Sequence, residues 1–320
     1  MFDSIKTMID HAEGTLLSVS DKVKGQRVLI GGRYEPGVPV QGVYGVLSYY
    51  LGTFLQKLGA RVEYYNTWQN SGKCSGKYDL GILCHYDTDW IVKTRDVQVI
   101  QRFIACTRRR LYYTNVVPAI DGFDHYLLSR ANYLSSADPV YKRKEYPSKR
   151  RPFGKAVWVG RAADNILLHP QQDPKKRYVI VDAAFESAQH VLEGRQIATT
   201  LERAKVPVHR IGFTQSKKMQ KRPFFDMIPI YNGSSVYICP NVGLYEMPVI
   251  EAQMAGNYVV SYKNVLHKDL LRPDTTWVCN TPDEVVDMVL KCPTDAMKPH
   301  GWAHAEFQWE DVLLRIAAVL

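Results

Sequence analysis

The sequence predicts an α/β fold made of two domains, each with a parallel sheet covered by helices. Its 320 residues suffice for two domains of ordinary size, each able to bury its own core. Short apolar runs of strand length alternate with longer stretches of helical periodicity in both halves. A basic, Pro-containing segment, 139–152, lies between the halves and is typical of a linker. We expect domains at 1–138 and 153–300, and a closing helix at 301–320.

The first half opens with a βαβ unit. A strand at 28–30 leads into a loop rich in Gly and Pro, 31–42, and then into a helix at 43–58 whose apolar residues keep helical spacing. Gly59 ends that helix and a strand follows at 62–65, which completes a right-handed parallel unit. Further elements are expected as strands at 80–84, 111–113 and 131–136 and a helix at 97–104.

The second half repeats this alternation. Its expected strands lie near 157 and at 178–181, 206–211, 236–239, 258–261 and 276–278. A helix is expected from Pro282 to Leu290, because Pro is favoured at the first helical position. The last helix carries an apolar stripe made of Trp309, Val312, Leu313, Ile316 and Leu320.

Composition excludes several classes of protein. No apolar run approaches the ~20 residues that span a bilayer. The first residues show no charged segment followed by an apolar block, so we expect a cytoplasmic protein, in the host cell if the source is viral. The six cysteines lack any Cys-x-x-Cys spacing, and neither a disulfide framework nor a zinc site is expected. The nine histidines form no metal pattern either.

The most informative stretch, 236–260, reads as strand, irregular loop, helix and strand. Pro240 stops the first strand, and a compact helix at 251–255 ends at Gly256 before the next strand. The loop at 240–248 therefore lies at the carboxyl end of a parallel sheet. Open α/β folds bind ligands there, close to helix N-termini.

Within this stretch, Met247-Pro-Val-Ile-Glu-Ala252 resembles the donor-binding signature of retaining GT-B glycosyltransferases. The resemblance implies two Rossmann-like domains facing a cleft, with the last helix crossing back to the first domain. In that family the second Glu of a Glu-x7-Glu pair holds the ribose hydroxyls of a nucleotide sugar, and Glu251 takes this role. The first Glu falls at Gly243, which departs from the pattern. Glu246 is the candidate catalytic replacement, or simply a solvated carboxylate.

Two upstream segments fall where the same family would place them. Lys155-Ala-Val-Trp-Val-Gly-Arg161 resembles the strand and turn that open the donor domain, so Arg161 would face the diphosphate as a catalytic and donor-binding cation. The family's following Lys is missing here, and Lys217 and Lys218 are the nearest substitutes unless they belong to a solvated basic loop. The remaining donor contacts implied by the resemblance are Gly42, Gly212, Phe213, Tyr231, Gly243, Leu244 and Tyr245.

Three further polar residues are candidates near the sugar or the acceptor. His85 follows the strand at 80–84, where the family often has a His facing the transferred sugar; a structural hydrogen-bonding role is the alternative. Asp87 and Asp89 are candidate acceptor contacts, or caps of the next helix. Arg109, within the run 108–110, is a candidate acceptor contact.

Charge bears on the acceptor. The net charge is +9 and the basic residues gather in runs at 108–110, 141–151 and 217–222. Such runs suit phosphate-backbone contact, or are solvated loops and a linker. The acceptor hypotheses are a hydroxymethylated pyrimidine in duplex DNA, as for virus-encoded DNA glycosyltransferases, and a glycan, lipid or small-molecule hydroxyl. A catalytically silent sugar-nucleotide or nucleic-acid binding protein is the third hypothesis, because Gly243 replaces the first Glu.

The resemblance implies a hexosyltransferase reaction that retains anomeric configuration. The co-substrate would be a nucleotide sugar, with a UDP-sugar preferred, and no permanently bound cofactor or metal ion is expected. Fixed cations and helix-end amides aimed at the leaving phosphate would stabilise the charge that develops there.

Overall fold

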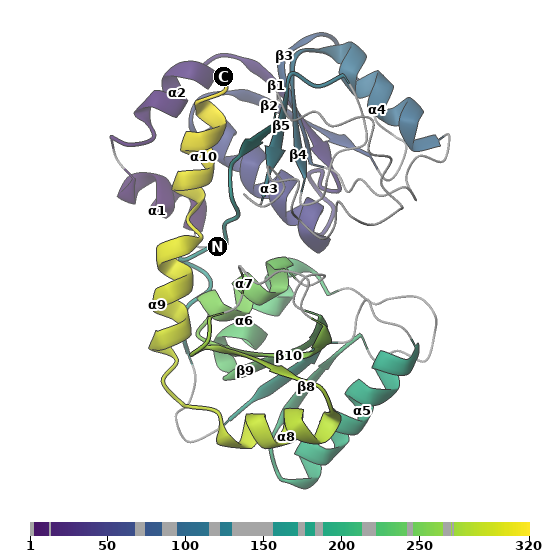
Figure 1. Ribbon diagram of the computed structural model, residues 1–320. Coiled ribbons are helices and arrows are strands. Elements are labelled where there is room, and N and C mark those ends of the chain that lie inside the picture. The colour runs from purple at the N-terminus through teal and green to yellow at the C-terminus, as the bar shows by residue number, and fades with distance from the viewer. Residues whose placement is uncertain are drawn as a thin grey trace. The chain divides into compact units, whose positions relative to one another are not determined.

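The computed structural model contains two α/β units, each built on a parallel sheet (Figure 1), as the sequence predicts. It describes residues 3–12, 14–67, 74–84, 95–114, 122–129, 156–171, 177–182, 188–212, 222–241, 246–264, 270 and 272–320. Unit 1 comprises residues 1–161 and 309–320, and unit 2 comprises residues 162–308. The chain thus enters unit 1 again at its last helix.

Unit 1 holds a sheet with the strand order β2-β1-β3-β4-β5-β6, in which every neighbouring pair is parallel. Its elements are α1 (Ser4–His11), α2 (Leu17–Val23), β1 (Arg27–Gly32), α3 (Gly42–Lys57), β2 (Arg61–Asn66), β3 (Tyr78–Cys84), α4 (Arg95–Cys106), β4 (Thr107–Thr114), β5 (His125–Leu128), β6 (Ala156–Trp158) and α10 (Trp309–Ala317).

Unit 2 holds a parallel sheet with the order β11-β10-β9-β7-β8. Its elements are β7 (Val179–Asp182), α5 (Ala188–Arg203), β8 (Val208–Ile211), α6 (Phe224–Gly233), β9 (Val236–Asn241), α7 (Glu246–Met254), β10 (Tyr258–Asn264), β11 (Thr276–Cys279), α8 (Pro282–Lys291) and α9 (Met297–Glu306).

The glycine at the end of β1 allows α3 to lie close to the sheet of unit 1. A Cβ built on Gly32 would meet the Cβ of Ser48 at 2.7 Å and the carbonyl oxygen of Tyr44 at 3.2 Å. Both contacts belong to α3, so a side chain at this position would push the helix away from the strand. The opposite face of the sheet packs against α4 through Phe103.

The last helix, α10, belongs to unit 1 and is anchored there by an aromatic cluster. The Trp309 ring stacks on Tyr50 with centroids 5.1 Å apart and packs against Phe54 at 5.7 Å. These three side chains are at most 2% exposed. Trp309 of the predicted apolar stripe is thus packed against α3, and Val312, Leu313 and Ile316 of the same stripe are buried as well.

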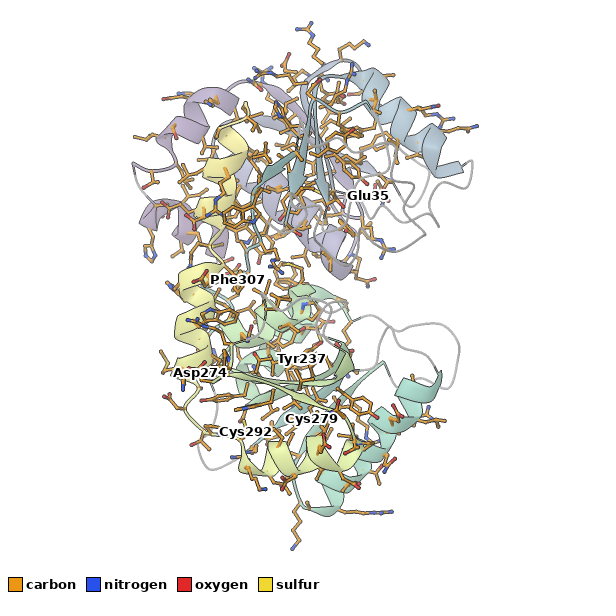
Figure 2. All side chains as sticks on the ribbon, viewed as in Figure 1. Glu35, Tyr237, Asp274, Cys279, Cys292 and Phe307 are labelled. Atoms are coloured by element: carbon orange, nitrogen blue, oxygen red, sulfur yellow. A yellow bond between two sulfur atoms is a disulfide. The ribbon has the colours of Figure 1, made fainter. Side chains whose placement is uncertain are left out.

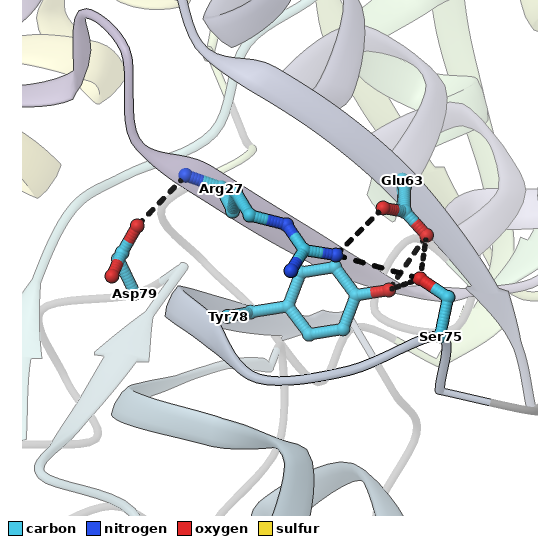
Figure 3. A network of polar contacts seen from close by, with 5 residues as sticks. All are labelled: Arg27, Glu63, Ser75, Tyr78 and Asp79. Atoms are coloured by element: carbon cyan, nitrogen blue, oxygen red, sulfur yellow. Dashed lines mark hydrogen bonds and ion pairs between the residues drawn. The ribbon is translucent and has the colours of Figure 1, made fainter.

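A polar network ties together the amino ends of β1, β2 and β3 (Figure 3). Glu63 accepts hydrogen bonds from the Tyr78 hydroxyl at 2.6 Å, from Ser75 at 2.8 Å and from Arg27 at 3.2 Å. The Arg27 guanidinium also lies over the Tyr78 ring, 4.8 Å from its centroid. The main-chain N–H of Arg27 donates to Asp79 at 3.0 Å. This end of the sheet lies opposite the strand ends at which α/β folds bind ligands.

A disulfide joins Cys74 to Cys106, with Cα atoms 6.2 Å apart. The sequence predicts no disulfide framework, and Cys84, Cys239, Cys279 and Cys292 are free and buried. Cys74 and Cys106 depart from this prediction because β3 and α4 bring these two distant cysteines together, which their spacing alone does not reveal. Disulfides are rare in the reducing cytosol, so this bond weighs against the predicted cytoplasmic location.

The strand β6 belongs to the sheet of unit 1, not to the second domain as predicted from the sequence. β6 was expected to open the second domain, but it pairs with β5 of unit 1 through Tyr126↔Ala156 and Leu128↔Trp158. A three-residue strand carries too little pattern to indicate its sheet. The strand expected at 131–136 lies outside the described residues.

No helix among the described residues combines the length and apolar character needed to cross a bilayer.

Candidate functional site

The order of the strands in the sheet of unit 2 indicates where a ligand would bind. From β7 the chain crosses to β8 on one side and then returns to β9 on the other side of β7. Neighbouring connections therefore diverge between β7 and β9. This is a topological switch point, and the crevice for a ligand lies outside the carboxyl ends of such strands.

The two faces of this sheet carry different chemistry. Val179, Val181, Val236 and Ile238 pack with α5 and α8 in an apolar core. Because side chains alternate along a strand, Asp182 and Tyr237 point to the other face, which α6 and α7 cover. Figure 2 shows Tyr237 in the interior of unit 2. Polar side chains are thus gathered on one face, where Asp182 ends β7 and Tyr237 of β9 reaches it.

Glu251 is the central carboxyl of this group. It comes from the middle of α7, is 6% exposed, and is hydrogen-bonded to the hydroxyl of Tyr231 on α6. Burial raises the pKa of Glu251 to about 8, against an ordinary value of 4.5, while the bond from Tyr231 lowers it. The side chain is therefore a carboxyl that changes its charge near neutral pH.

Tyr231 lies deeper than its predicted place against the base implies. Its side chain is 3% exposed, and burial together with the neighbouring Glu251 and Asp182 raises its pKa well above the ordinary value. The hydroxyl consequently stays protonated and donates to Glu251. The structure thus brings together two of the predicted donor residues, with Tyr231 supporting Glu251 rather than lying open to solvent.

Asp182 and Tyr237 form a second buried pair beside the first. The Tyr237 hydroxyl donates to the Asp182 Oδ2 at 2.7 Å, and its ring centroid lies 6.1 Å from that of Tyr231. Asp182 is 6% exposed. Neither residue is among the site residues predicted from the sequence. The signal that was present is an acidic residue directly after the apolar run 179–181, at the carboxyl end of a predicted strand.

Two predicted glycines adopt backbone conformations that favour glycine. Gly42 has φ 65° at the first position of α3, and Gly212 has φ 79° directly after β8. Both lie in the left-handed region, which side chains with a Cβ rarely adopt. Gly212 directly follows the carboxyl end of β8, and Gly42 begins the helix that comes after β1.

Arg161 is 8% exposed and is the last residue of the first segment of unit 1. It follows Gly160, whose carbonyl accepts a hydrogen bond from Tyr113 at 2.6 Å. This turn was predicted to open the donor domain, whereas β6, which precedes it, belongs to the sheet of unit 1.

Arg109 lies away from the carboxyl ends of the strands. It is the third residue of β4, at the amino end of that strand, and its guanidinium donates to the main-chain oxygen of Leu320. The structure therefore does not bring Arg109 to the edge where the predicted ligand contacts gather.

Several predicted site residues lie outside the described residues. They are His85, Asp87, Asp89, Phe213, Lys217, Gly243, Leu244 and Tyr245. Glu246 is described only as the first residue of α7, a position where a negative charge is favourable. Within the described part of the chain, no group of three His, Cys, Asp or Glu side chains is arranged to hold a metal ion.

Comparison with known proteins shows the fold. No protein-family model matches the sequence, and no curated protein matches it by sequence at a significant level. Sucrose-phosphate synthase from Thermosynechococcus elongatus superimposes with a TM-score of 0.56 at 13% identity, over 92% of this chain and 98% of that one.

Two other solved structures agree. A glycosyltransferase from Rickettsia africae gives a TM-score of 0.54 at 10% identity, covering 91% of this chain and 96% of that one. HepE from Anabaena, solved with UDP-glucose, gives 0.54 at 12% identity, covering 92% and 98%. The two parallel-sheet units of this chain therefore have the GT-B fold of glycosyltransferases.

Proposed function

We propose that this protein is a glycosyltransferase that takes a hexose from a nucleotide sugar and moves it to a hydroxyl acceptor. The observation that carries the proposal is the buried carboxyl of Glu251 on α7, the helix that follows β9 in unit 2. Its sequence surroundings, Met247 to Ala252, resemble the donor signature of retaining GT-B enzymes. The GT-B fold agrees with this assignment but does not by itself establish activity.

In this proposal Glu251 accepts hydrogen bonds from the ribose hydroxyls of the donor. An ionised carboxylate has two oxygens that can accept, so it can hold two neighbouring hydroxyls at once. A site built to pair with buried polar groups discriminates strongly against ligands that lack them. Glu251 would thus select a nucleotide with a ribose, in which both the 2′ and the 3′ hydroxyl are present.

We propose a UDP-sugar as the donor, because HepE, which shares the fold, is solved with UDP-glucose. Arg161 stays our proposed contact for the diphosphate, on the resemblance of the residues around it. A guanidinium suits phosphate oxygens because its planar fork donates two parallel hydrogen bonds. Glu246 and His85 keep their proposed catalytic roles on the same resemblance.

For the acceptor, we propose a hydroxymethylated pyrimidine in DNA, which the net charge of +9 favours. Two of the arginines in the basic run 108–110 interact with other groups of the protein. Arg108 pairs with Asp79 at 3.6 Å, and Arg110 donates to the carbonyl oxygens of Thr107 and Gly122. A glycan, lipid or small-molecule hydroxyl is the second candidate, because these arginines contact the protein itself.

The test is transfer of label from a panel of radiolabelled nucleotide sugars, with and without hydroxymethylpyrimidine-containing DNA. We expect label to leave a UDP-sugar and enter that DNA. Release of free sugar without transfer to DNA would support the transferase and reassign the acceptor to the second class. No turnover of any donor, with nucleotide sugar still bound, would favour a catalytically silent binding protein.

A further inference from the structure

The contact between Tyr231 and Glu251 carries a consequence for donor binding, which rests on the proposed function. Glu251 is enclosed by protein, and its described hydrogen-bond partner is a tyrosine hydroxyl, which is neutral. A carboxyl buried with a neutral partner holds its proton more tightly than one in water. In the free protein Glu251 is therefore mainly protonated at neutral pH.

A protonated carboxyl is a poor partner for two ribose hydroxyls. One of its oxygens carries the proton and acts as a donor, so the group accepts fewer hydrogen bonds than the carboxylate does. Hydroxyls that donate to the charged form stabilise it. A donor that brings two hydroxyls to Glu251 thus favours loss of the proton.

We propose that Tyr231 is a positioning residue that holds Glu251 ready for ionisation, so that binding of a nucleotide sugar releases one proton from this carboxyl to the solvent. The hydroxyl of Tyr231 remains protonated throughout and donates to the newly formed carboxylate. Loss of this donor would leave the ionised state with one hydrogen bond fewer in a buried place.

The other titratable groups around α7 have partners or positions of their own, so Glu251 is the group whose ionisation we expect to change when a nucleotide sugar binds. Asp182 and Cys239 act on Tyr231, and Asp182 is already paired with Tyr237. From β10, Tyr258 and Tyr262 face the core on the opposite side of the sheet. From α9, His300 lies beside the carbonyl of Met254 at the last turn of α7, Lys298 pairs with Asp274, and His304 lies beside Asn165.

The experiment is calorimetric titration of the full chain with UDP-glucose between pH 6 and 9. This ligand has a diphosphate diester with no proton to lose in that range. We expect affinity to rise about tenfold from pH 6 to pH 7 and to level off above pH 8. At pH 7, heats measured in buffers of different ionisation enthalpy should report about one proton released, and at pH 9 almost none.

Matched variants separate the role of Tyr231 from a loss of packing. Tyr231→Phe removes the hydroxyl on Glu251 and should weaken binding about tenfold at pH 7, with recovery at pH 9. Tyr237→Phe removes a hydroxyl of equal size that contacts Asp182 instead, and should leave the pH midpoint of binding where it is in the unaltered protein.

Each outcome has one meaning. Binding of UDP-glucose with an affinity that does not change with pH, or with proton uptake, overturns the inference and leaves the proposed function standing. An equal shift in both tyrosine variants overturns the role of Tyr231. Absence of UDP-glucose binding at every pH overturns UDP-glucose as the donor and the inference with it, and the proposed function is then decided by the panel of other nucleotide sugars.

Discussion

At the scale of single residues, Glu251 combines deep burial with a titratable group, and this has a consequence for stability. Its pKa is about 8 in the folded protein, against 4.5 when exposed. The folded state therefore binds the proton more tightly than the unfolded state does. The stabilisation from this group is complete below pH 4.5 and is lost as the pH rises through 8.

Replacing Glu251 with Gln tests this directly, since Gln has the shape of the protonated acid. Each pH unit between the two pKa values is worth at most about 1.4 kcal/mol. From pH 5.5 to 7.5 the free energy of unfolding of the unaltered protein should thus fall by up to about 3 kcal/mol relative to Glu251→Gln. Urea denaturation at both pH values measures it. Parallel pH dependence in the two proteins would show that Glu251 is not buried as described.

Residue-scale patterns in the sequence predict only part of the site. Glu251 could be predicted because the run Met247 to Ala252 is contiguous. Asp182 and Tyr237 could not, because they meet only through the parallel register of β7 and β9. The hydrogen bond of Tyr231 depends in turn on how α6 lies against α7, which no local pattern in the sequence expresses.

At the scale of elements, α3 lies close against β1 in unit 1. Gly32→Ala would place a Cβ 2.7 Å from Ser48, and the nearby carbonyl of Tyr44 cannot turn away as a side chain can. We expect a loss of about 1–3 kcal/mol in the free energy of unfolding. Denaturant unfolding measures this loss.

Gly45→Ala is the matched control for this substitution. Its Cβ would lie 3.8 Å from Arg33, an ordinary contact, and Ala favours the helix over Gly. The control should therefore be neutral or stabilising. Equal effects of the two substitutions would refute the account of how α3 meets the sheet.

The disulfide fixes the segment before β3 to the end of α4. It spans a sequence separation of 32 residues, for which loop closure in the unfolded chain predicts a stabilisation of about 3–4 kcal/mol. Reduction, Cys74→Ser and Cys106→Ser should each lower the melting temperature. The double variant should be no less stable than either single one, because one bond is lost in all three.

A reducing agent provides the control for this experiment. It should have no effect on the serine variants, because the four other cysteines are free and buried. If reduction leaves the melting temperature of the unaltered protein unchanged, the bond does not form in solution. In that case the disulfide would no longer weigh against the cytoplasmic location predicted from the sequence.

The sequence predicts the helices and strands more completely than it predicts which elements pair with one another. The helix at 43–58 and the strands at 28–30 and 62–65 correspond to α3, β1 and β2, because their apolar periodicity is long or is bounded by Gly. β6 carries no such information in three residues, and its sheet is decided by pairing with β5. Likewise the two cysteines of the disulfide are brought together by the arrangement of α4 and the segment before β3, which their sequence separation does not reveal.

At the scale of the whole molecule, each unit repeats one topological plan. In unit 1 the chain runs from β1 to β2 on one side and returns to β3 on the other, just as it does around β7 in unit 2. Each sheet therefore has a switch point, at β1 and β3 in the first and at β7 and β9 in the second. The sequence predicts this alternation of strand and helix, and the observed strand orders locate the two switch points.

The central claim is that the crevice of unit 2 holds a nucleotide sugar through Glu251. It is tested most directly by calorimetric titration of UDP-glucose at pH 8.5 into the unaltered protein, Glu251→Ala and Glu202→Ala. Glu202 is the control. It is a half-exposed carboxylate on α5, and it pairs with Arg210 of β8 at 2.6 Å. We predict that Glu251→Ala weakens binding at least tenfold while Glu202→Ala leaves it unchanged. Equal affinity in all three proteins would contradict the account.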